Sequence, residues 1–120
     1  MLDERKAHPN IRGSNVSGTK VYSREGEHLG YIDDLVIGKT NGRVQYVIMC
    51  FGSFLGMGGY FHPMPWERLE YDCSKQGYVV DMKRQDLEKA PHYAGGMEPD
   101  WNDEQWGRNV YNYYGIAPYF

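Results

Sequence analysis

The sequence predicts a mainly β protein with about five or six predominantly antiparallel strands, a short helical turn and an aromatic C-terminal extension. Of its 120 residues, 15 are glycine and 11 are tyrosine, a composition that favours turns and strands over long helices. Two segments rich in β-branched and aromatic residues, 29–38 and 42–51, flank Asn41-Gly42, the dipeptide most typical of a tight β-hairpin. A chain of this length has room for one domain with one core.

The N-terminal residues 1–15 are polar and show neither the period of a strand nor that of a helix. We therefore expect a flexible leader, followed by a domain that spans residues 16–93. Its first strand is predicted at residues 20–23. The turn that closes this strand contains Gly26, which can supply the positive φ that such a turn needs.

Further strands are predicted after the hairpin, at residues 60–66, 68–72 and 77–82. Residues 83–89 are mostly charged helix formers, so they indicate one or two helical turns with Asp81 as a possible cap.

The strand at residues 42–51 is apolar on both faces. Side chains alternate between the two faces of a strand, and here both alternating sets are hydrophobic. One face belongs to the core, and the other needs a cover, either from another segment of the chain or from a second subunit. The two sets are Val44, Tyr46, Ile48 and Cys50 on one face, and Val47, Met49 and Phe51 on the other.

The extension at residues 94–120 contains seven aromatic side chains and a net charge of -3. Trp106, Val110, Tyr113 and Tyr114 have the spacing of one helical face, which predicts a short helix docked on the domain or on a partner. We expect Asn102 as its N-cap and Gly115 at its C-terminal end. Gly107 weakens this helix by about 1 kcal/mol relative to alanine.

Composition excludes several classes of function. The formal charge of -3 and the lack of Lys and Arg clusters argue against nucleic-acid binding. We expect no membrane insertion, because no window has the roughly 20 apolar residues that span a bilayer. Residues 1–15 are charged where a secretory signal is apolar, so we expect a cytoplasmic protein.

The residue types that carry chemistry do not form a catalytic or metal-binding pattern, and we expect no enzyme and no cofactor. Asp33-Asp34 is interpreted as a bulge or turn. Cys50 is expected to be a buried, inert thiol, and it has no CxxC partner in Cys73. The four histidines lack ligand spacing and are interpreted as surface or rim residues: His8, His28, His62 and His92.

Residues 51–66 (FGSFLGMGGYFHPMPW) form a glycine-rich bend between two strands. With the strands before them, they resemble the PRC-barrel domain family over residues 16–93, although Gly59-Tyr60 replaces the acid–lysine pair common in that family. The resemblance implies that the strands close into a small antiparallel β-barrel. Its signature residues are Gly52, Phe54, Leu55, Gly56, Gly58, Pro65 and Trp66.

The resemblance also implies a role in binding other proteins. The family includes the cytoplasmic domain of the photosynthetic reaction-centre H subunit and the C-terminal domain of a ribosome maturation factor. We therefore expect a non-enzymatic scaffold or adaptor module that forms a homodimer and binds a protein not yet known. Two alternatives remain open: a barrel with a small-molecule or cofactor cleft beside residues 56–59, and a ribosome- or RNA-associated factor. The candidate interaction surface is Val47, Met49, Phe51, Tyr60, Trp101, Trp106, Tyr113 and Tyr114.

Overall fold

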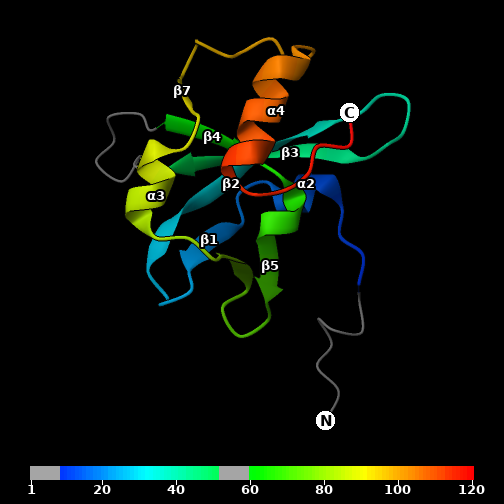
Figure 1. The fold of residues 1–120 in the computed structure, drawn as a ribbon. Coiled ribbons are helices and arrows are strands. Elements are labelled where there is room, and N and C mark those ends of the chain that lie inside the picture. The colour runs from blue at the N-terminus through cyan, green and yellow to red at the C-terminus, as the bar shows by residue number, and fades with distance from the viewer. Residues whose placement is uncertain (1–8, 52–59) are drawn as a thin grey trace.

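The computed structural model describes residues 9–51 and 60–120, and in these ranges the chain is mainly β, as predicted (Figure 1). Seven strands form one sheet in the order β5-β6-β1-β2-β3-β4-β7. The strands are β1 (Lys20–Ser23), β2 (His28–Ile37), β3 (Val44–Phe51), β4 (Tyr60–Met64), β5 (Leu69–Asp72), β6 (Gly77–Val80) and β7 (Tyr93–Ala94).

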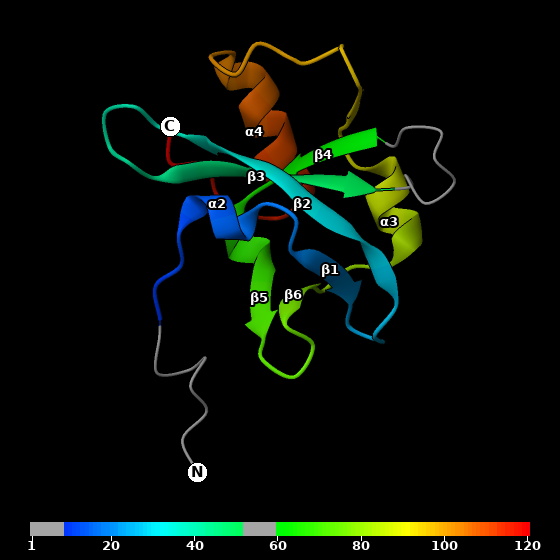
Figure 2. The same cartoon turned by 180° about the vertical axis from the view of Figure 1, so that it is seen from behind.

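Within the described residues, four short helical elements accompany the sheet: α2 (Gly13–Val16), the 3-10 helix η1 (Trp66–Arg68), α3 (Arg84–Lys89) and α4 (Glu104–Tyr113). The first of them begins at Gly13, three residues before the expected start of order, and it buries Val16. The two opposite views show α4 on one side of the central strands and α2 on the other (Figure 2).

The central hairpin and the bulge form as the sequence predicts. In the turn between β2 and β3, the Gly38 N–H donates to the Arg43 carbonyl at 2.8 Å, and Gly42 has a φ of 70°. The predicted hairpin is therefore confirmed. The β2–β3 register shifts between Ile32 and Asp34, which makes Asp33 the extra residue of a bulge and confirms that interpretation.

The sheet differs from the prediction in topology. In the described part of the chain it has seven strands instead of five or six, because β7 adds a two-residue strand after α3. The pairing of β1 with β6 is parallel, whereas every other pair is antiparallel. Among the described residues, no pairing joins β5 to β7, so the sheet is open and the closed barrel is not confirmed.

Both predicted helix caps are wrong. The N-cap position of α3 is Lys83, without a side-chain hydrogen bond, and the Asp81 carboxylate instead lies 3.0 Å from Nε of Arg24. In α4 the cap is Asp103, one residue after Asn102. At the other end of α4, Gly115 has a φ of 72°, the left-handed conformation expected after a helix.

Replacing Asp103 with alanine is expected to lower the free energy of unfolding by about 1 kcal/mol, the usual effect of losing an N-cap. The Asp103 carboxylate accepts hydrogen bonds from the backbone N–H groups of Gln105 and Trp106, at 3.0 and 3.3 Å. Urea denaturation of D103A measures the effect, with N102A as the control at the neighbouring exposed position. Equal losses in the two variants would contradict the assignment of the cap.

Candidate functional site

The β3 residues of the predicted interaction surface are buried within the single chain. Val47, Met49 and Phe51 all belong to the hydrophobic core, together with Val21 of β1, Ile32 of β2 and Val80 of β6. Tyr46, Ile48 and Cys50 on the alternate face are buried as well. Neither face of β3 is therefore an exposed docking surface, and the expectation that this strand supplies one is wrong.

The C-terminal extension covers the Tyr46 face of β3. The Tyr46 ring contacts the rings of Trp101, Trp106 and Tyr111, with centroid separations of 5.5, 6.0 and 6.0 Å. The Tyr111 hydroxyl donates to the Gln45 carbonyl at 2.6 Å, which fixes α4 against the strand. Of the predicted surface, Trp101 and Trp106 are thus half-buried in this packing.

Tyr114, another member of the predicted surface, lies in the core. Its hydroxyl is buried and has no hydrogen-bond partner among the described residues. Burial is the main cause that raises the pKa of Tyr114, and likewise that of Tyr111. Both phenols therefore stay neutral at physiological pH and act as packing groups.

Gly107 allows α4 to approach the sheet closely. A Cβ atom at this position would clash with Oη of Tyr46 and would lie 2.9 Å from the Phe120 ring. The Phe120 ring also packs edge-on against Tyr111, at 5.2 Å between centroids. The glycine that weakens α4 as an isolated helix is thus the residue that lets two aromatic rings pack against its backbone.

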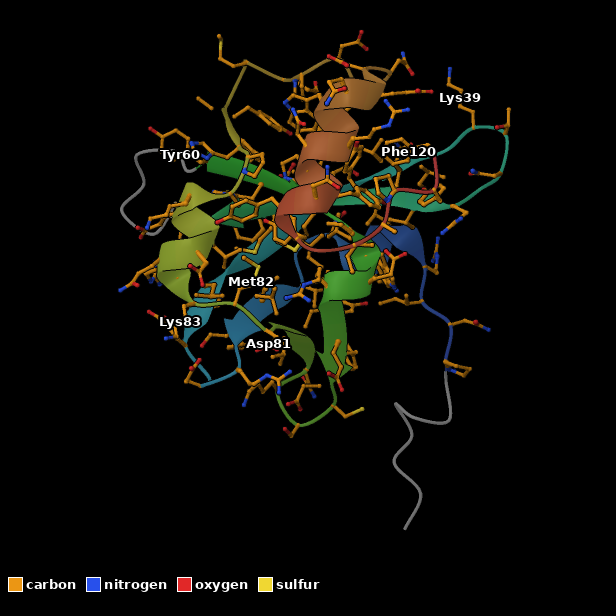
Figure 3. The ribbon with its side chains drawn as sticks, viewed as in Figure 1. Lys39, Tyr60, Asp81, Met82, Lys83 and Phe120 are labelled. Carbon is orange, nitrogen blue, oxygen red and sulfur yellow. The ribbon has the colours of Figure 1, made fainter. Side chains whose placement is uncertain are left out.

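Two members of the predicted surface remain exposed, Tyr60 at 53% and Tyr113 at 40%. They flank α3. The Tyr113 hydroxyl donates to the Asp86 carbonyl at 2.6 Å, and the Tyr60 ring contacts His92, just after α3, at 5.0 Å. Figure 3 shows Tyr60 at the start of β4, beside α3. We call Tyr60, Tyr113 and the exposed side chains of residues 83–89 the α3 surface.

A pair of histidines lies next to the α3 surface, and the sequence interpretation of His62 as a surface or rim residue is wrong. His62 is only 1% exposed, whereas His92 is exposed. The two rings are 5.0 Å apart, and Phe51 packs edge-on against His62 at 5.4 Å. Burial first, and the neighbouring His92 second, lower the pKa of His62 to about 4. His62 is therefore neutral at pH 7.

The alternation of β4 could have located His62 in the interior. His62 pairs with the core residue Met49, and residues that face each other across antiparallel strands point to the same side of the sheet. Its contact with His92 could not be found by spacing, because the two residues are 30 positions apart and the β4–β7 pairing brings their segments together.

An open polar groove of about 180 Å³ lies beside β5 and β6. Two arginines and three acids contribute to it, and they partly neutralise one another. Arg24 pairs with Asp81, and Nη2 of Arg68 donates to the Asp81 carbonyl at 3.4 Å. The groove is lined by Arg24, Glu67, Arg68, Leu69, Glu70, Val79 and Asp81.

Within residues 9–51 and 60–120, no three His, Cys, Asp or Glu side chains gather in a way that would hold a metal ion. Cys50 is buried and forms no disulfide. No helix of the described segments has the length and apolar character to cross a membrane.

Only two of the predicted signature residues, Pro65 and Trp66, lie within the described structure. Pro65 precedes η1, and the half-buried Trp66 packs edge-on against Tyr78 at 5.7 Å. The predicted small-molecule cleft beside residues 56–59 lies outside the described residues, as do Gly52, Phe54, Leu55, Gly56 and Gly58.

Comparison with known families identifies the fold. The PRC-barrel domain model matches residues 8–86, about two thirds of the chain. The chain belongs to the PRC-barrel domain family. A search of curated proteins finds no match. The PRC-barrel match ends inside α3, so β7, His92 and the whole of α4 lie beyond the part of the chain that the family describes.

Proposed function

We propose that this PRC-barrel chain is a non-enzymatic protein-interaction module, a scaffold or adaptor, whose first partner is a second copy of itself. The observation that carries the proposal is the exposure of Tyr60 and Tyr113 on the α3 surface, while the other predicted surface residues are wholly or partly buried by the chain itself. Tyrosine is enriched at protein interfaces because its ring offers apolar area and its hydroxyl a hydrogen bond.

The charges of the α3 surface suit contact with an identical surface. Lys83 and Lys89 lie at the two ends of the helical segment, with Asp86 and Glu88 between them, and all four are exposed. In a dimer with two-fold symmetry the same patch meets itself in reverse orientation, so that a lysine of one copy faces an acid of the other. The exposed tyrosines would supply the apolar centre of this contact.

A dimer at micromolar concentration is the expected result of gel filtration coupled to light scattering. The double variant Y60S/Y113S should raise the dissociation constant at least about tenfold, since aromatic anchors near the centre of an interface often contribute about 2 kcal/mol each. Y71S is the matched control, because Tyr71 is 42% exposed but lies on β5. Circular dichroism verifies that all variants fold.

A monomeric wild-type protein would reject self-association. The adaptor role is tested separately by affinity capture from the host, with wild-type protein and Y60S/Y113S as baits. A partner retained by the wild type and lost with the double variant supports docking at the α3 surface. Equal capture by both baits would place the docking elsewhere.

We further propose that the module works in the cytoplasm. The Cys50 thiol, which is buried in β3 and forms no disulfide, supports this, because a reducing compartment keeps cysteines unpaired.

A further inference from the structure

The histidine pair beside the α3 surface brings together two imidazole rings from different parts of the chain. His62 reaches the pair from β4, and His92 from the connection between α3 and β7. Their ring centroids are 5.0 Å apart and the rings are tilted by 33°. Two imidazoles bonded to one tetrahedral ion at about 2.0–2.1 Å place their ring centres about 5 Å apart. The separation of the two rings is therefore compatible with two ligands of one ion.

Both rings have a nitrogen that is free to bind. Nδ1 of His92 lies 2.8 Å from the Ala90 carbonyl, which can only accept, so Nδ1 carries the proton and Nε2 keeps its lone pair. Such a bond to the second nitrogen is the usual support of a metal-binding histidine. Nδ1 of His62 is buried without a hydrogen-bond partner among the described residues. A buried polar atom of this kind calls for an explanation, and a bound ion is one.

The surroundings suit an ion that prefers nitrogen ligands. Phe51 packs on His62 and Tyr60 packs on His92, so the side chains next to the pair are aromatic rings that offer no carboxylate oxygen. The guanidinium of Arg84 lies 5.0 Å from the centroid of the Phe51 ring, and its charge is neutralised by a salt bridge with Glu27, with 2.9 Å between Nε and Oε2. Imidazole suits zinc, nickel and copper, whereas magnesium and calcium require oxygen ligands.

We propose that His62 and His92 form a binding site for a divalent transition-metal ion such as Zn²⁺ or Ni²⁺. The two histidines supply two coordination positions, and water fills the others. Because His92 is exposed, the ion enters from the solvent beside Tyr60. Binding therefore joins β4 to the segment after α3 and stabilises the folded chain by mass action.

The test measures the melting temperature of the full chain with about 1 mM of Zn²⁺, Ni²⁺ or Mg²⁺, against a sample containing a chelator. We expect Zn²⁺ and Ni²⁺ to raise the melting temperature by several degrees and Mg²⁺ to leave it unchanged. Isothermal titration of H92Q should show at least about a tenfold loss of Zn²⁺ affinity, comparable to losses at known metal sites. H28Q serves as the control because His28 is exposed and not in contact with the pair.

Three results would overturn the site: no effect of Zn²⁺ on the wild type, the same Zn²⁺ affinity in H92Q as in the wild type, or loss of affinity in H28Q. Since His92 is exposed, H92Q should fold, and the test does not depend on a change in the core. Shifts of the His62 and His92 ring proton resonances on addition of Zn²⁺ would locate the ion independently. These measurements need no assumption about dimer formation.

Discussion

Replacing Gly107 with valine is expected to lower the free energy of unfolding by about 3 kcal/mol or more and to detach the C-terminal extension from β3. The valine Cβ would meet Oη of Tyr46 and the Phe120 ring, and Tyr46 cannot retreat easily because it is buried and packs against Trp106 and Tyr111. Overpacking a core typically costs about 1–3 kcal/mol, and loss of α4 would also expose the buried face of β3. Urea denaturation gives the free energy, and tryptophan fluorescence reports on detachment through Trp101 and Trp106.

The matched control is N112V. Asn112 is exposed on the same helix, and asparagine and valine have similar helix propensities, so this change should alter stability by less than about 0.5 kcal/mol. Limited proteolysis between residues 95 and 103 should be faster in G107V than in N112V. If G107V has the stability and the fluorescence of the wild type, the close approach of α4 to Tyr46 is not present in solution.

Gly107 illustrates the limit of local reasoning from sequence. Helix propensity correctly indicates a cost for glycine at this position, and the spacing of Trp106, Val110 and Tyr114 correctly predicts a helix with one apolar face. The benefit of the glycine appears only when Tyr46 lies against the helix backbone. That contact joins residues about 60 positions apart, which no helical period can reveal.

The same holds for the cover of β3. Alternation along the strand is enough to predict that both faces are buried, and the structure bears this out. Alternation does not identify the covering segment, because an apolar face looks the same in sequence whether its cover is in the same chain or in another. The ring contacts between Tyr46 and residues of the extension decide in favour of the same chain.

Strand topology was predictable only where neighbouring segments pair through a short turn. The β2–β3 hairpin carries its own signal in Asn41-Gly42, and it forms as predicted. The parallel pairing of β1 with β6 brings together segments more than 50 residues apart, and β7 has only two residues, too few to show a period. The histidine pair could not be predicted for the same reason: His62 and His92 come close only because β4 pairs with the short strand β7.

Acidification is expected to destabilise the protein through His62. Burial and the neighbouring His92 lower the pKa of His62 to about 4, whereas an exposed histidine in the unfolded chain titrates near 6.5. The unfolded state therefore binds the proton more readily, and stability that is complete above about pH 6.5 is lost as the pH falls toward 4. A shift of this size corresponds to about 3 kcal/mol. Urea denaturation at several pH values, with a chelator present, measures the loss.

The variant H62L isolates this contribution from that of the carboxylates, which also titrate in acid. Leucine has a similar volume, and Nδ1 of His62 has no hydrogen-bond partner among the described residues, so the stability of H62L at pH 7 should be close to that of the wild type. At pH 4 the variant should be the more stable of the two by about 3 kcal/mol. H28Q, altered at an exposed histidine, should retain the full acid sensitivity. If H62L loses as much stability as the wild type between pH 6.5 and 4, the buried neutral state of His62 is not the source of the effect.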